Sequence, residues 1–329
     1  MLPSARALLT GILDYAGLFP PAQLPMAEAV RRFRGHQTGG DGWMLARFVI
    51  PAGRLAELPP LLGGTAAPQP AVRLAVLGRP ADLDGDLADI ESFTGRHGAL
   101  ATVEQLELRL PHDPRQIAGI VGRSAAAIRR RLPSATAFFE PSLLDRWPEQ
   151  LACTIDALGA VPGHDAVGLK IRCGGLDAPA VPSPQAVAAA LAACRLAGVP
   201  LKATQGLHQP LRHLDGGLGA TVHGFLNLLV AGVLGHLHAL SERELLAIVE
   251  EVEAAAFRFD DNGLAWAGLA AGLDAIAAGR RAAVTSFGSC SFAEPRDALR
   301  ELGLLDRGGP TASRSGPERG GRTTENGTD

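Results

Sequence analysis

Eight short β-rich runs alternate with helical stretches along most of this chain, and this alternation limits the folds that it can adopt. The pattern is typical of parallel βαβ units in an α/β protein. A (β/α)₈ TIM-type barrel is the simplest closure of eight units, and an open doubly wound sheet is the alternative. No Gly-x-Gly-x-x-Gly motif follows the early runs, which disfavours a nucleotide-binding open sheet. The expected strands are Ile12–Phe19, Trp43–Ile50, Val72–Leu77, Val103–Leu110, Thr136–Glu140, Val167–Arg172, Val199–Thr204 and Ala283–Phe287.

The connection before the last expected strand is unusually long. We expect residues 1–305 to form a single barrel domain, with a largely helical insertion at about 207–281 over the barrel mouth. The insertion includes a hairpin at Phe257–Trp266, turned by Asp-Asn-Gly. Residues 306–329 have almost no apolar side chains and are expected to be a disordered tail. The expected helices are Ala27–His36, Leu83–His97, Pro114–Leu132, Pro148–Leu158, Pro184–Ala197, Thr221–His238, Glu242–Ala256 and Ala267–Ala278.

Composition limits the partners of the chain. The formal net charge of −3 over 329 residues gives no electrostatic footprint for nucleic acid. No signal peptide or membrane span is recognisable, and the four cysteines lie far apart without a Cys-x-x-Cys pair. We therefore expect a cytoplasmic protein with reduced thiols and a small-molecule substrate, and neither a cofactor nor a metal is called for.

Lysine is almost absent: Lys170 and Lys202 are the only two, and the other 29 of the 31 basic residues are arginines. Arginine replaces lysine wherever charge alone matters, but its guanidinium keeps its proton and does not attack a carbonyl. The two lysines stand in similar contexts, Val167-Gly-Leu-Lys-Ile-Arg172 and Val199-Pro-Leu-Lys-Ala-Thr204. We interpret both as retained for the chemistry of a primary amine; the simpler alternative is chance survival on strand ends.

Alternation along three strands places charged side chains on one face. Lys170 and Arg172 alternate with apolar residues on the sixth strand, Lys202 does so on the seventh, and Glu107 and Arg109 do so on the fourth. A barrel strand packs its apolar face against the helices and points the other face inward. We therefore expect these groups to share the barrel interior. Like charge then lowers the pKa of a lysine there, and a neutral amine can form a Schiff base.

These two lysine-bearing strands resemble those of class I, Schiff-base aldolases of the deoxyribose-phosphate aldolase type. The resemblance covers about Val167 to Gly206, where that family carries one lysine on the sixth barrel strand and one on the seventh. It implies that Lys170 forms the covalent iminium while Lys202 depresses its pKa. The family's hydroxyl-rich run after the first lysine is replaced here by Ile-Arg-Cys.

Other candidates lie where strands end, which is where barrels carry their active sites. Glu140 ends the fifth strand, and Asp14 and Tyr15 lie in the first. Glu140 either moves protons or caps the following turn, and Tyr15, the only tyrosine, is either a hydrogen-bond donor or a core residue. His208 follows the seventh strand and is either a proton carrier or a loop histidine that bonds the backbone.

Small residues after the last two strands favour an anion site. Gly206 follows the seventh strand, and Gly288 and Ser289 lie in Ser286-Phe-Gly-Ser-Cys-Ser291 at the eighth. Backbone N–H groups in such a place can hold a phosphate, although a simple turn is the alternative. Arg172 and Arg47 are expected to hold a carboxylate or phosphate. Cys290 could act as a nucleophile, but the sequence places no base beside it.

The sequence therefore predicts a lyase of the aldolase kind that acts on a small anionic carbonyl compound. Lys170 forms an imine, Lys202 tunes it, and Glu107 or Glu140 moves protons through water.

Two alternatives stay open. One is a metal-dependent lyase or isomerase built on Glu140, His208 and His223. The other is a non-catalytic barrel that binds an anionic metabolite through its arginines and lysines.

Overall fold

Eight parallel strands close into a barrel in the computed structural model, which describes residues 1–63, 70–163 and 166–306. Their order around the barrel is β1-β13-β7-β6-β5-β4-β3-β2. Each neighbouring pair runs parallel. The predicted (β/α)₈ barrel is confirmed, and the open-sheet alternative is wrong. The strands are β1 (Leu13–Tyr15), β2 (Leu45–Pro51), β3 (Val72–Gly78), β4 (Ala101–Arg109), β5 (Thr136–Glu140), β6 (Val167–Arg172), β7 (Leu201–Thr204) and β13 (Val284–Ser289).

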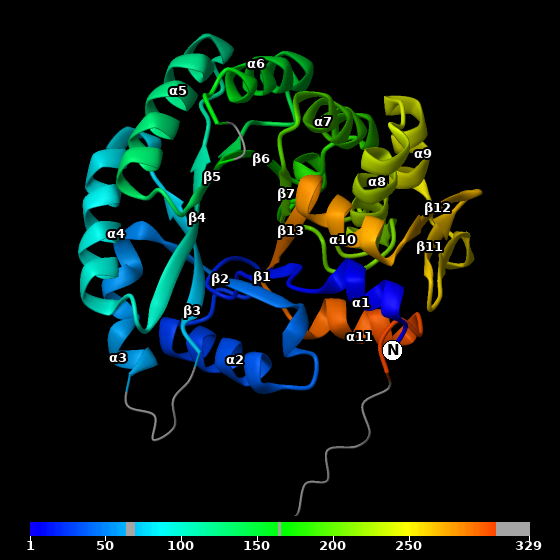
Figure 1. Ribbon diagram of the computed structural model, residues 1–329, viewed down its shortest axis with the longest axis horizontal. Helices are drawn as coiled ribbons and strands as arrows, with labels where there is room; N and C mark the ends of the chain where they lie inside the picture. The colour runs from blue at the N-terminus through cyan, green and yellow to red at the C-terminus, as the bar shows by residue number, and fades with distance from the viewer. Residues whose placement is uncertain (64–69, 164–165, 307–329) are drawn as a thin grey trace, which may run out of the picture.

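Helices surround the barrel, as Figure 1 shows. They cover the outward apolar side chains of the strands, which lie in one continuous buried core. The helices are α1 (Pro3–Leu9), α2 (Met26–Thr38), α3 (Pro59–Leu62), α4 (Leu83–His97), α5 (Pro114–Arg131), α6 (Trp147–Gly159), α7 (Pro184–Ala197), α8 (Phe225–His238), α9 (Glu242–Glu250), α10 (Leu273–Ala282) and α11 (Ala293–Glu301).

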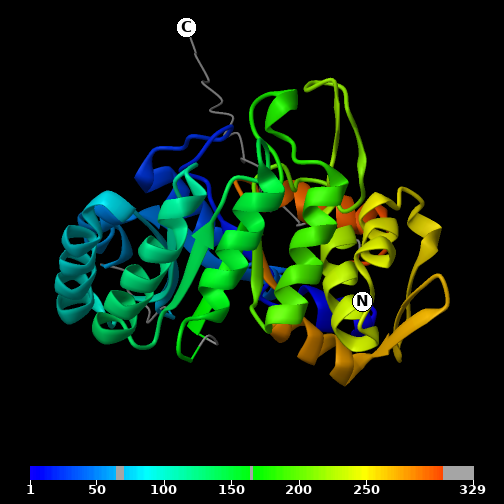
Figure 2. The same ribbon diagram turned by 90° about the horizontal axis from the view of Figure 1, so that it is seen from above.

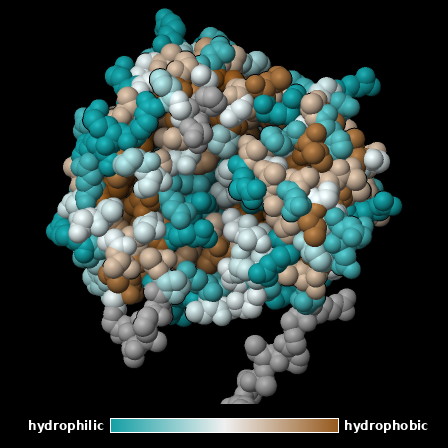
Figure 3. All heavy atoms as spheres, in the orientation of Figure 1, coloured by the Kyte–Doolittle hydropathy of each residue, from teal (hydrophilic) through white to brown (hydrophobic). Residues whose placement is uncertain are grey.

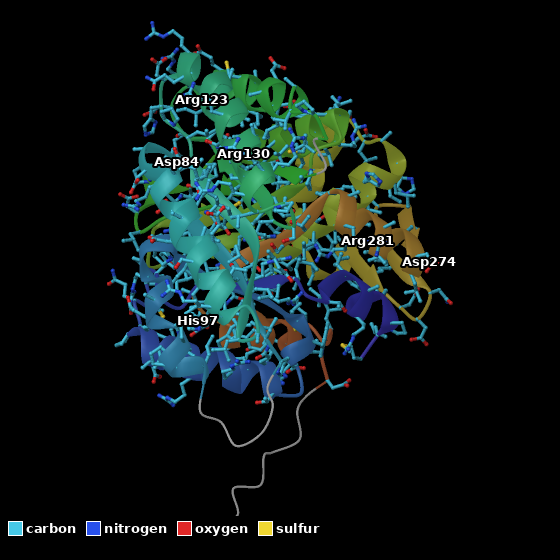
Figure 4. The ribbon with its side chains drawn as sticks, turned by 60° about the vertical axis from the view of Figure 1, so that its left-hand side comes forward. Asp84, His97, Arg123, Arg130, Asp274 and Arg281 are labelled. Carbon is cyan, nitrogen blue, oxygen red and sulfur yellow. The ribbon has the colours of Figure 1, made fainter. Side chains whose placement is uncertain are left out.

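Helix α5 shows why these segments are helical and how they face. Its residues Ile117, Val121 and Ile128 recur at helical spacing and are buried. Asp113 caps its first turn by accepting a hydrogen bond from a backbone N–H, and Pro114 occupies the first helical position. The charged side chains of Arg123 and Arg130 point away from the barrel in Figure 4. The apolar stripe therefore sets which face of the helix packs on the strands.

Most of the predicted insertion lies on the outside of the barrel, which corrects the expectation that residues 207–281 cover the mouth. Of this insertion, only the hairpin of β8 (His213–Asp215) and β9 (Ala220–Val222) rises above the end of the barrel, beside the loop after β6 (Figure 2). Helix α8 packs against α7 and β13, and α9 packs against α7 and α8. Every residue from Phe225 to Gly235 is buried, so α8 belongs to the outer layer of the barrel.

The second half of this connection differs from the predicted helix at Ala267–Ala278. Strands β10 (Phe257–Phe259), β11 (Gly263–Trp266) and β12 (Leu269–Gly272) form an antiparallel sheet, and α10 starts only at Leu273. The hairpin predicted at Phe257–Trp266 is confirmed. Alanine- and leucine-rich residues favour a helix locally, but pairing with β11 holds β12 extended.

The surface is mixed in hydropathy. On the face seen in Figure 3, hydrophobic residues form only small separate patches among hydrophilic ones. Across the three described ranges, every helix is too short or too polar to cross a membrane. The predicted tail lies outside the described residues from position 307 onward.

Candidate active site

A cavity of about 480 Å³ opens at the carboxyl ends of the barrel strands. Glu107, Glu140, Lys170 and Lys202 contribute to its lining from inside the barrel. The loops that follow the strands supply the rest of the wall. From these loops and from the upper strand ends come Arg109, Arg172, Gly174, Thr204, Gln205, His208, Gly288, Ser289 and Cys290.

The charged residues inside the barrel form one chain of alternating sign. Glu107, Lys170 and Lys202 point into the barrel as predicted, whereas Arg109 lies at the mouth with its side chain 65% exposed. Cations and carboxylates follow one another across the interior, each within ion-pair distance of the next. Carboxylates therefore separate the two lysines, although Lys170 and Lys202 are register partners on adjacent strands. The order of this ion network is Arg47, Asp14, Lys202, Glu107, Lys170, Glu140, Arg172.

All three N–H donors of the Lys202 ammonium are engaged. Its Nζ lies 2.6 Å from Asp14 Oδ2 and 2.5 Å from Glu107 Oε1, and it donates to Gln105 Oε1 at 2.6 Å. An ammonium has three N–H donors, and these three oxygens use all of them. The Lys202 side chain is only 1% exposed, and its Nζ lies 5.9 Å from the centre of the Phe138 ring. Lys202 is therefore a fixed cation at the bottom of the site.

Lys170 has fewer partners and borders the cavity. Its Nζ lies 2.7 Å from Glu107 Oε2 and 2.7 Å from Glu140 Oε2. Among the residues that the structure describes, no third acceptor holds this ammonium, and Lys170 is part of the cavity wall. One of its three donors is therefore available to a molecule in the cavity.

The pKa of Lys170 moves opposite to the sequence-based expectation. Burial favours the neutral amine, but Glu107 and Glu140 outweigh it and raise the pKa above its ordinary value. The expectation counted the like charge of Lys202 on the neighbouring strand and not the carboxylates between them. Lys170 is consequently protonated at rest.

The three carboxylates are held ionised by the same contacts. Burial favours the neutral acids, but the neighbouring cations outweigh it and lower the pKa of Asp14, of Glu107 and of Glu140. For Glu140, Lys170 and Arg172 lower the pKa to about 2. Buried charge of one sign is costly without a partner, so network pairing is what allows all of these groups to remain charged in the interior.

The two arginines expected to bind an anion lie at opposite ends of the network. Arg172 is at the cavity mouth, where its Nε and Nη2 donate to Glu140 Oε1 at 3.2 and 3.0 Å and its Nη1 donates to Gln205. Arg47 is not part of the cavity wall and pairs with Asp14 at 3.3 Å and with Glu104 at 2.8 Å. The structure therefore does not bring Arg47 to the cavity that Arg172 borders.

Asp14 and Tyr15 both lie outside the cavity wall. Asp14 is fully buried below the cavity, where Ser286 Oγ donates to its Oδ2 at 2.6 Å. Tyr15 points to the other face of β1 and packs among Phe33, His36 and Phe48. The core-residue interpretation of Tyr15 is the one that the structure supports.

The residues after β7 and β13 meet at one side of the mouth. Gly288, Ser289 and His208 border the cavity, as expected for an anion site. Gly206 does not; it has a φ of +75°, and a Cβ there would lie 2.9 Å from the Cα of Gly174. It allows two loops to approach closely, which is the turn alternative.

The residues named for the metal alternative are not grouped as metal ligands in the described structure. His223 is buried, and its Nε2 lies 2.8 Å from the carbonyl oxygen of Pro182, whereas His208 and Glu140 border the cavity. Among the described residues, no three His, Cys, Asp or Glu side chains are grouped as metal ligands.

Sequence reasoning missed several partners. Gln105 binds Lys202, Ser286 binds Asp14, and Gln205 binds Arg172. The period-2 pattern that selected Glu107 also places Gln105 inward, but it does not show that Gln105 binds Lys202. Glu294, which lies 2.9 Å from His208, carries no such signal because it lies in the first turn of a helix that follows another strand.

Comparisons with solved structures find weak similarity to deoxyribose-phosphate aldolases. The tetrameric enzyme from Aeropyrum pernix shares 13% identity over 92% of this chain and 94% of its own, with a TM-score of 0.45. A candidate deoxyribose-phosphate aldolase from Coccidioides immitis shares 12% over 63% and 76%, with a TM-score of 0.39. The lysine/ornithine decarboxylase from Vibrio vulnificus, solved with cadaverine, shares 14% over 61% and 48%, with a TM-score of 0.33. No family model and no curated protein matches this chain.

Proposed function

We propose that this protein is a lyase of the aldolase kind that binds a small anionic carbonyl compound as an imine on Lys170. The observation that carries the proposal is the difference between the two lysines. Lys170 borders the cavity with one donor free among the described residues, and Lys202 has all three engaged. The nucleophile is therefore assigned to Lys170, and Lys202 acts on it only through Glu107.

The ion network is compatible with this chemistry because a protonated imine carries the same charge as the ammonium it replaces. Glu107 and Glu140 then stabilise the iminium as they stabilise the resting lysine. Only the neutral amine that attacks the carbonyl carbon is disfavoured. Its proton passes to Glu140 or Glu107, directly or through water, and returns when the carbinolamine loses its oxygen as water.

The cavity also supplies charge for the anionic end of the substrate. Arg172 lies at the mouth with its side chain 39% exposed, and Arg109, 65% exposed, lies 4.0 Å from Glu140. Both line the cavity. A carboxylate or phosphate at the mouth would therefore meet two guanidinium groups while its carbonyl carbon reaches toward Lys170.

Reductive trapping tests the proposal. The protein is incubated with acetaldehyde, pyruvate or glyceraldehyde 3-phosphate, reduced with borohydride and analysed by peptide mass spectrometry. We expect a stable adduct on Lys170 with at least one of these carbonyl compounds and none on Lys202. Absence of an adduct on Lys170 across this panel and a broader set of aldehydes and ketones would refute the imine.

A second candidate, a non-catalytic barrel that binds an anionic metabolite, is favoured by one observation, the raised pKa of Lys170. Lys170→Arg separates the two functions because arginine keeps the charge and cannot form an imine. An imine enzyme loses trapping and turnover completely in this variant, whereas a binder keeps its affinity for the anionic compound within about tenfold. Thermal unfolding of the variant checks that the barrel is intact.

A further inference from the structure

Cys290, His208 and Glu294 contact one another in this order beside the mouth of the cavity, and none of them belongs to the ion network. Cys290 directly follows β13, His208 is in the loop after β7, and Glu294 is in the first turn of α11. Cys290 Sγ lies 4.0 Å from His208 Nε2, and His208 Nδ1 lies 2.9 Å from Glu294 Oε2. Cys290 and His208 both border the cavity that Lys170 borders.

This arrangement has the parts of an activated thiol. A nucleophile and a base in contact, with an acidic group on the far side of the base, is the general signature of nucleophilic catalysis. Glu294 is at ion-pair distance from Nδ1 but is not aligned for a hydrogen bond, so it acts on the ring by charge. Its carboxylate faces Nδ1, the ring nitrogen on the side away from Cys290.

The thiol needs that base. Burial raises the pKa of Cys290; a backbone N–H of Ala22 acts in the opposite direction, and the charge of Glu294 adds to the rise. Cys290 is therefore a protonated thiol at rest. His208 gives the proton a place to go at the moment when the sulfur attacks.

We propose that Cys290 is a second covalent site in this cavity and adds reversibly to aldehydes, with His208 as its base. The Sγ–H proton moves to His208 Nε2 as the S–C bond forms, and the carbonyl π electrons move to oxygen. That oxygen then takes the proton back from His208, which gives a neutral hemithioacetal and needs no other reactant. The choice of an aldehyde rests on the proposed function, because the neighbouring amine also reacts with carbonyl carbon, and a thiol adds to aldehydes far more readily than to ketones.

Iodoacetamide labelling with peptide mass spectrometry tests the thiol, and the other cysteines serve as internal references. Cys153 is half-buried, and Cys173 is fully buried with a pKa raised to about 12. We expect Cys290 to be labelled fastest. His208→Ala should slow its labelling by about tenfold to a hundredfold, and added imidazole should restore part of the rate, which a purely structural role of His208 would not allow. His213→Ala, a histidine of the same connection whose Nδ1 contacts the carbonyl of Leu211, should leave the rate unchanged.

Propionaldehyde tests the adduct. It should protect Cys290 from iodoacetamide in a saturable way, and the protection should disappear when the aldehyde is removed by gel filtration. Protection should persist in Lys170→Arg. If it is lost in that variant, lysine and not cysteine holds the aldehyde, which overturns this proposal and supports the imine. If it persists while borohydride leaves no adduct on Lys170, the imine fails and the cysteine site stands. Labelling of Cys290 no faster than Cys153, or unchanged by His208→Ala, also overturns the proposal.

Discussion

Glu140→Gln is the sharpest test of the ion network, because the structure gives both the size and the pH dependence of its effect. Glu140 is buried between Lys170, at 2.7 Å, and Arg172, at 3.0 Å. These cations lower its pKa from the ordinary 4.5 to about 2. A shift of this size corresponds to about 3 kcal/mol of folding free energy in favour of the ionised form, at 1.36 kcal/mol per pKa unit.

The sign of the pH dependence follows from the direction of the shift. A carboxyl whose pKa is depressed in the folded state stabilises the protein above its unfolded pKa and loses this effect as the pH falls through its folded pKa. For Glu140 that window runs from about 4.5 down to about 2. Glutamine carries no charge, so the difference between wild type and Glu140→Gln should be about 3 kcal/mol at pH 7 and roughly 1 kcal/mol at pH 3.

Urea unfolding of both proteins at pH 7 and pH 3, followed by circular dichroism, measures the difference. Glu149→Gln is the matched control, because Glu149 pairs with Arg146 on the surface, where both side chains are half exposed. That substitution should change the free energy of unfolding by less than about 1 kcal/mol at either pH. A loss at pH 7 no larger than that of the control, or a loss that does not shrink at pH 3, would refute the view that Glu140 is held ionised by its two cations.

Two other substitutions test the positions of residues in and behind the barrel wall. Tyr15→Phe should change the free energy of unfolding by less than about 1.5 kcal/mol and leave borohydride trapping unaltered, since the ring packs between Phe33 and Phe48 away from the cavity. A loss of trapping would show that the Tyr15 hydroxyl takes part in the reaction. Gly168→Ala should destabilise the barrel by about 1–3 kcal/mol in urea unfolding, because a Cβ would lie 2.9 Å from the carbonyl oxygen of Pro200 and closer still to the Phe138 ring; an unchanged midpoint would contradict this packing.

The strands that carry the site could be predicted from the sequence because their pattern is local. Thr136–Glu140 and Val167–Arg172 are confirmed to the residue, and each is an alternating run bounded by loop residues. Ile12–Phe19 is shortened to Leu13–Tyr15, because the chain turns at once, with Phe19 N–H donating to the carbonyl of Ala16. Local pattern therefore gives the faces of strands well and their ends less well.

The pairing inside the barrel could not be predicted in the same way. Alternation shows that Glu107 and Lys202 point inward, but their contact joins residues 95 positions apart across the interior. It depends on the register of β4, β5, β6 and β7, which follow one another around the barrel. The expected direction of the Lys170 pKa failed for this reason: Glu107 was expected in the same interior, but the direct contacts of Glu107 and Glu140 with the Lys170 ammonium were not.

The structure also gives different reasons for a lysine at position 170 and at position 202, whereas the sequence alone indicates one reason for both. Lys202 is held by three oxygens at 2.5 to 2.6 Å, a geometry that suits the compact, three-donor head of an ammonium better than the planar fork of a guanidinium. Lysine is needed there for its shape. Lys170 has two carboxylates and a cavity in front of it, so an arginine would keep those ion pairs and lose only the amine. Reactivity is therefore a reason to keep lysine at position 170, and it is not required to explain position 202.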